Sequence, residues 1–182
     1  MVRHVIRAAE SLVAIGDIVI ATSTASSDDP VVSYCTSLGA TVIRGPLDDV
    51  IERFRLCARQ RPTDWLLRLN ADSPLIPPHI LARIVDARNR GTFDLITTIF
   101  PRTFARGHNA ELIRRSALLA IGDEELTAED REHVTAFFYK HSARFAICNI
   151  ESETRVVADA SFAVDTLDDL RRLEQLDPAQ VI

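Results

Sequence analysis

Two aspartates stand at places in the sequence where a carboxylate could do chemistry. Asp72 lies in RLNADSPLIPP, residues 68–78, after the apolar run DWLL and before a stretch typical of a helix. Asp165 follows FAV and precedes a helix expected from Leu167. In open α/β sheets, ligands bind in the crevice outside the carboxyl ends of the strands. Two carboxylates there could share one Mg²⁺, an ion usually held by one or two carboxylates plus substrate phosphates.

The same two residues also have an interpretation that needs no ligand. Asp72 could cap the turn at Ser73–Pro74, and Asp165 could help to cap the last helix. Arg68 and Arg102 could bind a phosphate or a sugar carboxylate, but each could equally be solvated or ion-paired. Spacing alone leaves these alternatives open.

The elements that would position these residues follow an alternating order. Apolar runs alternate with amphipathic stretches, which is typical of βαβ units and a mainly parallel sheet. We expect strands within residues 17–23, 41–45, 64–70, 93–100 and 143–150, with another ending near residue 113. We expect helices at residues 2–14, 29–39, 48–60, 78–91, 114–122 and 127–141, and from residue 167.

Several helix ends carry recognisable signals. Asp48 is expected to cap the helix at residues 48–60, and Gly39 follows the end of the preceding helix. Thr127 with Asp130, and Thr166 with Asp169, have the spacing of capping boxes. These signals fix where the elements begin and end.

Composition narrows the class of protein. The chain has 182 residues and is 47% hydrophobic, which suits a single domain over residues 1–182 with its own core. The net charge of -5 argues against a general nucleic-acid binder. No apolar run is long enough to span a membrane, and the N-terminus is unlike a signal peptide. The three cysteines have no metal-like spacing and suit a reducing cytoplasm.

Six ordered segments together resemble a known family of enzymes. They are IATSTASSDD, VIRGPLDDVIERF, RLNADSPLI, PRT, REHVT and VDTLDDL, and they span nearly the whole chain. In this order and spacing they look like the cytidylyltransferases that make activated acidic sugars. The nearest branch is that of the spore coat polysaccharide biosynthesis proteins, relatives of acylneuraminate and Kdo cytidylyltransferases.

This resemblance implies a fold, a reaction and a site. The implied fold is a Rossmann-like three-layer α/β/α sandwich of the nucleotide-diphospho-sugar transferase type, with a mostly parallel sheet. In the implied reaction, a sugar hydroxyl attacks the α-phosphate of CTP and releases pyrophosphate. Asp72 and Asp165 match the aspartates that hold Mg²⁺ in relatives. The residues expected to contact substrate are Arg68, Asn70, Ser73, Arg102, Asn109 and Glu111. Relatives are commonly dimers, so the resemblance allows a homodimer, but the sequence itself does not give the oligomeric state.

The sequence also departs from the family pattern. Ala71 replaces a glycine, Asn109 stands where relatives place an aspartate, and His108 stands where they place an apolar residue. The glycine-rich loop that cradles the CTP phosphates in relatives, and the strand before it, have no counterpart in residues 1–182. Since backbone N–H groups of such a loop bind the phosphates, this departure argues against activity of the chain as given.

Three hypotheses follow. The first is a CTP-dependent sugar cytidylyltransferase that supplies a CMP-sugar for surface polysaccharide synthesis. The second is a non-catalytic relative that acts as a binding or scaffold module. The third is a GT-A-like glycosyltransferase, which would need a DxD-type metal motif at a strand end; no such pair stands near Asp72.

Overall fold

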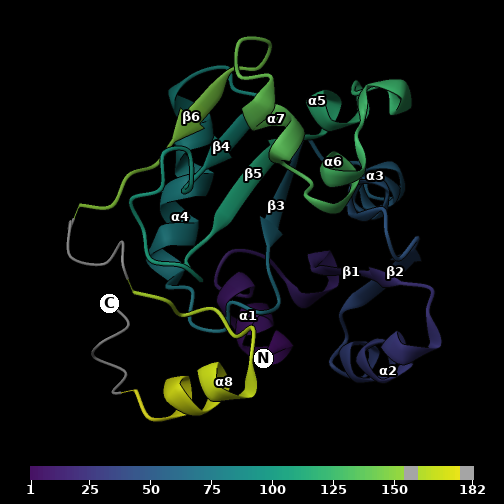
Figure 1. The fold of residues 1–182 in the computed structure, drawn as a ribbon, viewed down its shortest axis with the longest axis vertical. Helices are drawn as coiled ribbons and strands as arrows, with labels where there is room; N and C mark the ends of the chain where they lie inside the picture. Colours follow the sequence, from purple (N-terminus) through teal and green to yellow (C-terminus); the bar gives the residue numbers. More distant parts are fainter. Residues whose placement is uncertain (154–159, 177–182) are drawn as a thin grey trace. The chain divides into compact units, whose positions relative to one another are not determined.

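The chain folds into two compact units in its computed structural model, which describes residues 1–153 and 160–176 (Figure 1). Unit 1 consists of Met1–Leu12, Leu67–Leu112 and Ile147–Ile182, and unit 2 of Val13–Leu66 and Ile113–Ala146. Each unit has its own buried side chains and is described by itself. The single domain expected from the sequence stays a prediction.

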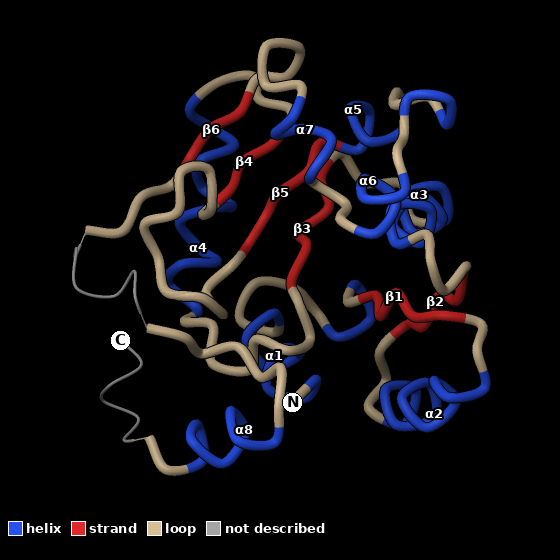
Figure 2. The backbone as a smooth tube through the Cα atoms, in the orientation of Figure 1, coloured by secondary structure: helices blue, strands red, loops and turns tan. Residues whose placement is uncertain are grey.

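Unit 1 carries the segments around both aspartates. Its elements are α1 (Val2–Ala9), α4 (Pro78–Ala87), β4 (Leu95–Thr97), β6 (Ile147–Asn149) and α8 (Leu167–Glu174). Strands β4 and β6 pair in parallel, with Leu95 opposite Ile147 and Thr97 opposite Asn149. Helix α4 packs against β4 and α1 (Figure 2). Its buried face consists of Ile80, Leu81, Ile84 and Ala87.

Unit 2 is built on a second parallel pair. Strands β1 (Val19–Ser23) and β2 (Thr41–Gly45) pair along their full lengths, and α3 (Val50–Gln60) packs on both. The connecting helix α2 (Asp29–Ser37) has Pro30 in its first turn. Gly39, at φ +87°, follows its end in the left-handed region that suits glycine. The remaining helices are α5 (Arg115–Leu119), α6 (Ala128–Glu132) and α7 (Ala136–Lys140).

Two further strands cross the boundary between the units. Strands β3 (Trp65–Leu69) and β5 (Ala110–Arg114) join β4 and β6 in a four-stranded sheet of order β3-β5-β4-β6. Short 3₁₀ turns complete the chain: η1 (Ile15–Asp17), η2 (Ser26–Asp28), η3 (Arg88–Arg90) and η4 (Asp123–Glu125). The α/β class with parallel strand pairing is confirmed. No helix among the described residues is long and apolar enough to cross a membrane.

The expected helices differ most from the structure at two places. The first helix ends at Ala9 rather than near residue 14, and the Ser11 hydroxyl donates to the Ala8 carbonyl at 2.6 Å. Such a side-chain bond competes with helical pairing. The helix expected at residues 127–141 is two short helices, because His133 leaves the helical region with φ -111° and ψ 91°. Val134 and Thr135 follow; both are β-branched and buried, so packing overrides helix formation there.

Two other expectations are corrected near the ends of elements. The cap of α3 is Asp49, not Asp48; its Oδ1 accepts from the Glu52 N–H at 2.9 Å. Residues 160–164, the described residues directly before Asp165, form no regular strand, and an isolated parallel bridge joins Ser161 to Arg106. Asp165 therefore follows an extended segment whose backbone hydrogen bonds go to loop and turn residues rather than to a neighbouring strand.

Candidate active site

Asp72 lies in a tight turn after the carboxyl end of β3. The Ser73 N–H donates to the Asn70 carbonyl at 3.2 Å, and the Ser73 hydroxyl donates to Asp72 Oδ1 at 2.8 Å. Ser73 is only 2% exposed, so the turn is anchored through its side chain. The Asp72 carboxylate is half-buried. Among the described residues no cationic side chain pairs with this carboxylate. The Ser73 hydroxyl therefore meets only part of its capacity to accept hydrogen bonds.

Asp165 is brought next to this turn by the extended segment before it. The Val164 N–H donates to the Asp72 carbonyl at 2.9 Å, so the residue before Asp165 is bonded to the backbone of Asp72. Upstream, the Arg106 N–H donates to Ala160 at 3.0 Å and the Phe162 N–H to Arg106 at 2.7 Å. The structure thus brings the segments of both aspartates together within unit 1.

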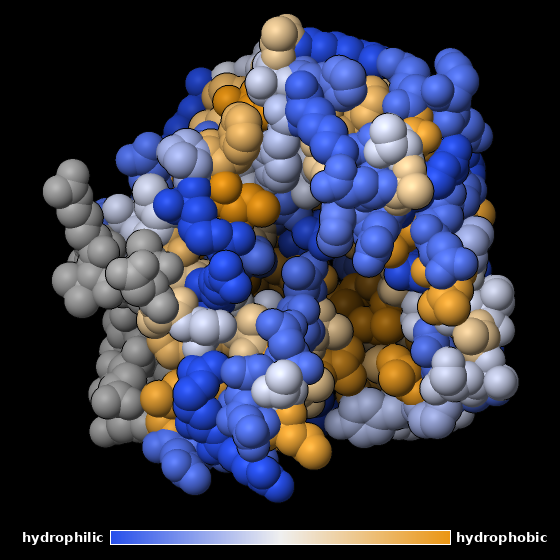
Figure 3. All heavy atoms as spheres, in the orientation of Figure 1, coloured by the Kyte–Doolittle hydropathy of each residue, from blue (hydrophilic) through white to orange (hydrophobic). Residues whose placement is uncertain are grey.

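The carboxylate of Asp165 is exposed and does not cap α8. The cap is Thr166, whose N–H and hydroxyl donate to Asp169 Oδ2 at 2.9 and 2.8 Å. Asp169 completes the box by donating its N–H to the Thr166 hydroxyl at 3.2 Å, as the spacing predicts. Most of the side chains on the face of α8 seen in Figure 3 are charged or polar, although Leu167 at the start of the helix is 69% exposed. Since Thr166 and Asp169 together cap the helix, the Asp165 side chain remains available for a ligand.

The donor chemistry of this pair fits a hard divalent cation that also binds substrate. Two carboxylates offer oxygen donors only, which suits Mg²⁺ or Mn²⁺ rather than a softer metal. No group of three or more His, Cys, Asp or Glu side chains that could hold a metal occurs within residues 1–153 and 160–176. An ion held by Asp72 and Asp165 would therefore complete its coordination with water and phosphate oxygens.

Arg68 and Glu111 form an ion pair between β3 and β5. Arg68 Nη1 donates to Glu111 Oε2, and the Glu111 side chain is only 1% exposed. A buried carboxylate needs such a partner, because losing it leaves an uncompensated charge. Arg68 Nε is buried without a partner among the described residues. Both residues were expected to contact substrate; the burial of Glu111 means that it would act on a ligand through Arg68.

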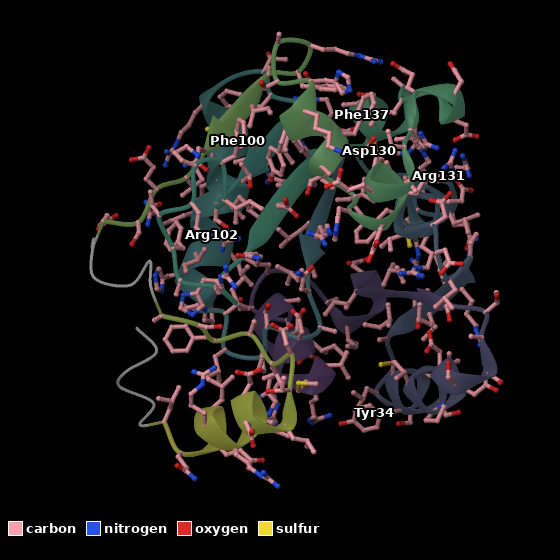
Figure 4. All side chains as sticks on the ribbon, viewed as in Figure 1. Tyr34, Phe100, Arg102, Asp130, Arg131 and Phe137 are labelled. Atoms are coloured by element: carbon pink, nitrogen blue, oxygen red, sulfur yellow. The ribbon has the colours of Figure 1, made fainter. Side chains whose placement is uncertain are left out.

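Arg102 and Asn109 lie together on the loop before β5. Arg102 Nη1 donates to Asn109 Oδ1 at 2.6 Å, and Arg102 is exposed (Figure 4). The loop is also held by Asn149, which the sequence analysis did not single out. Its Oδ1 accepts from the Phe100 N–H, and its Nδ2 donates to the Pro101 carbonyl, each at 3.0 Å. A lone asparagine at a strand end gives no sequence signal for such a role.

His108 is a further buried residue of this loop. Its ring stacks on Phe162, with centroids 4.7 Å apart and planes 11° apart. A ring N–H bonds to the Leu75 backbone, while Nε2 is buried without a partner in the described part of the chain. Burial lowers the pKa of His108 to about 4; the Leu75 bond raises it and nearby His79 lowers it further. The imidazole is neutral at pH 7, with its proton on Nδ1. Its replacement of an apolar residue was the only signal in the sequence.

Comparison with known proteins identifies the family. The cytidylyltransferase family model matches residues 1–179. An uncharacterized protein of Methanocaldococcus jannaschii is 26% identical over 85% of this chain, and a spore coat polysaccharide biosynthesis protein (SpsF) of Bacillus subtilis is 25% identical over 88%. The chain spans 63% and 66% of the lengths of these curated relatives.

Solved structures share the fold. A cytidylyltransferase from Leptospira borgpetersenii has a TM-score of 0.80 and 26% identity over 90% of this chain and 73% of that one. A CMP:2-keto-3-deoxy-manno-octonic acid synthetase solved with CTP has a TM-score of 0.69 and 15% identity, over 100% and 88% of the two chains. Rv0371C of Mycobacterium tuberculosis, solved with manganese, has a TM-score of 0.63 and 17% identity, over 96% of this chain and 86% of that one. The chain has the Rossmann-like fold of these enzymes and belongs to the cytidylyltransferase family.

Proposed function

We propose that this chain takes part in the transfer of a cytidylyl group from CTP to a sugar, with Mg²⁺ bound by Asp72 and Asp165. The products are a CMP-sugar and pyrophosphate, and the sugar is an acidic one destined for surface polysaccharide. Family membership supports the nucleotidyl transfer, and the spore coat relative supports the sugar pathway. The main observation in support of this site is the hydrogen bond from the Val164 N–H to the Asp72 carbonyl, which joins the segments of the two aspartates. Neither carboxylate has a cationic partner among the described residues.

The reaction forms one P–O bond and breaks another. The sugar hydroxyl oxygen attacks the α-phosphorus of CTP, and the bond to the bridging oxygen breaks. Pyrophosphate leaves with that electron pair, and the hydroxyl proton passes to solvent water. The ion supplies positive charge that offsets the charge developing on the phosphates. The role of Asp72 and Asp165 is to present their carboxylate oxygens to the ion at a fixed separation. Ser73 and the Val164 N–H restrain the turn that carries Asp72.

The residues around this pair suit recognition of a polar, anionic acceptor. Arg102 is exposed and is oriented by Asn109, so its guanidinium can meet a sugar carboxylate or a phosphate oxygen. Asn109 is neutral where relatives have an aspartate, so its contact with Arg102 places no negative charge beside the guanidinium. We assign Asn70 and Ser73 to the edge of the substrate site, and Arg68 with Glu111 to its buried floor.

The test measures CTP binding and then turnover, in a protein that joins residues 1–182 to the glycine-rich phosphate loop that relatives carry. Calorimetry with CTP should show binding that strengthens when Mg²⁺ is added, and Asp72→Asn and Asp165→Asn should each abolish that increase. Asp168→Asn is the matched control, because this exposed aspartate on α8 pairs only with Arg171 at 3.0 Å in the described structure. Pyrophosphate release is then compared across acidic and neutral sugars.

In the turnover assay, each of the two aspartate variants should lose on the order of 100-fold in rate. CTP binding that ignores Mg²⁺, or that Asp72→Asn and Asp168→Asn leave equally intact, would contradict the assigned metal site. Turnover with neutral sugars alone would keep the transfer reaction but overturn the acidic acceptor.

A further inference from the structure

The segments that carry Asp72 and Asp165 both meet the side chain of His108. The imidazole N–H bonds to the Leu75 carbonyl, and the ring face stacks on Phe162 at 4.7 Å. Leu75 lies three residues after Asp72, and Phe162 lies three residues before Asp165. One side chain therefore contacts both segments at equal distances along the chain from the two carboxylates.

The backbone around His108 allows little independent movement of the ring. Gly107 has φ +88°, and a Cβ there would lie 2.5 Å from the Phe162 carbonyl carbon, so only glycine permits this approach. The His108 N–H also donates to the Ala105 carbonyl at 3.1 Å, which closes the loop into a turn. The ring is thus carried by a loop fixed directly against the segment that leads to Asp165.

Packing alone does not call for a histidine here. His108 is only 3% exposed, and its Nε2 is a buried acceptor without a partner among the described residues, which is unfavourable. A leucine would fill similar space without that cost, but it could not donate to the Leu75 carbonyl. Compared with leucine or phenylalanine, histidine combines an N–H donor to the Leu75 backbone with a flat ring that stacks on Phe162.

We propose that His108 is a positioning residue that sets the separation of the Asp72 and Asp165 carboxylates. The inference rests on the proposed function in one respect: the two carboxylates bind a divalent cation. Small divalent cations demand near-ideal geometry, with oxygen ligands at about 2.0–2.1 Å for Mg²⁺, so a small shift of either segment weakens the site. His108 does not touch the ion or the substrate. It acts through the turn and the extended segment that it joins.

The experiment titrates the protein with Mn²⁺ alone and follows the electron paramagnetic resonance signal of the free ion. His108→Leu removes both contacts, and His108→Phe keeps a stacking ring but removes the N–H. His79→Gln is the control, because His79 is an exposed histidine near His108. We expect Mn²⁺ binding to weaken about 10-fold in His108→Leu, as for other residues that orient metal ligands. His108→Phe should weaken it by less, and His79→Gln should not change it.

Each outcome decides a different point. If His108→Leu melts at a temperature close to that of the wild-type protein yet binds Mn²⁺ equally well, His108 only fills space and the inference fails, while the metal site stands. If His108→Leu does not fold, His108→Phe decides: wild-type affinity in that variant overturns the role of the Leu75 hydrogen bond. If Asp72→Asn binds Mn²⁺ as the wild type does, the ion lies elsewhere, and both this inference and the proposed metal site fail.

Discussion

Asp130 of unit 2 and the two site aspartates of unit 1, Asp72 and Asp165, use their carboxylates in opposite ways. In unit 2, Asp130 is 2% exposed; it accepts from the Thr127 hydroxyl at 2.6 Å and from Lys140 Nζ at 2.9 Å. In unit 1, Asp72 accepts only from the hydroxyl of its neighbour, and the Asp165 carboxylate has no partner in the described part of the chain. The carboxylate of Asp130 stabilises unit 2, whereas we propose that those of Asp72 and Asp165 bind a ligand.

The same contrast extends to other charged residues of unit 2. Asp49 caps α3 and accepts from Arg131 Nη1 at 2.6 Å. Arg55 is 3% exposed; it donates to Asp123 at 2.5 Å and also to the Ile121 carbonyl. Figure 4 marks Asp130 and Arg131 within this unit. The charged side chains that stabilise unit 2 are thus paired with neighbours. We therefore interpret Asp72, which has no cationic partner among the described residues and lies on an anchored turn, as a functional residue.

The largest effect should appear in the acid sensitivity of unit 1. Because the folded pKa of His108 is about 4 against an ordinary 6.5, the unfolded chain binds more protons between these values. Its contribution to stability is complete above pH 6.5 and is lost as the pH falls toward 4, by on the order of 3 kcal/mol. Urea unfolding from pH 7 to 4 should show this slope, and His108→Leu should flatten it.

Unit 2 provides the control for that titration. Burial alone raises the pKa of Asp130, but hydrogen bonds from Thr127 and Lys140 outweigh it and lower the pKa below 3.8. Hydrogen bonds from Thr22 and Ser23 lower the pKa of Asp28 to about 2. Their contributions are present above pH 3.8 and are lost only as the pH falls below it. Amide exchange measures this when the rates are corrected for their intrinsic dependence on pH. A loss of protection in unit 2 as the pH falls from 6.5 to 4, in step with unit 1, would contradict the comparison.

A smaller effect is expected when a carboxylate is neutralised in each unit. Asp130→Asn removes the charge that Lys140 pairs with and turns an acceptor into a donor, so unfolding free energy should fall by about 2 kcal/mol. Asp72→Asn should change it by less than about 0.5 kcal/mol, because no cationic partner is lost. Urea denaturation at pH 7 measures both. A loss in Asp72→Asn equal to that in Asp130→Asn would restore the capping interpretation of Asp72.

The sequence predicts the elements of this fold better than the contacts between them. Local sequence signals predict the two capping boxes, Pro30 in the first turn of α2 and Gly39 after its end. Hydrophobic periodicity predicts the α/β class. Both kinds of signal depend on residues that are close in the sequence. The break at His133 was missed because burial of Val134 is a tertiary effect. The choice of Asp49 over Asp48 depends in part on Arg131, which lies 82 residues away in the sequence.

The candidate site divides in the same way. Asp72 and Asp165 were found from their places at element ends and from the family motifs. The bond from Val164 to Asp72 and the contact of His108 with Phe162 join residues far apart in the sequence, which no local pattern encodes. The roles of Arg68, Asn70, Ser73, Arg102, Asn109 and Glu111 in binding substrate stay predictions, as does the homodimer.

The smallest effect on stability offers the sharpest comparison, because each unit has a capping box of the same design. Thr127 with Asp130 caps α6, and Thr166 with Asp169 caps α8. Thr127→Ala and Thr166→Ala should each lower the unfolding free energy by about 1 kcal/mol. Only the second box adjoins a site residue: Asp169 Oδ2, besides serving Thr166, accepts from the Asp165 N–H at 3.3 Å.

Loss of the Thr166 hydroxyl should therefore loosen the backbone of Asp165 as well as the first turn of α8. We expect Thr166→Ala to weaken Mn²⁺ binding several-fold, about as much as other changes that disturb the orientation of a metal ligand. Thr127→Ala should leave Mn²⁺ binding unchanged at a similar cost in stability, so the pair separates a local effect on the site from a general loss of stability. Equal weakening in both variants would mean that Mn²⁺ binding follows global stability. No weakening in either would mean that the Val164–Asp72 bond alone is enough to hold Asp165 in place.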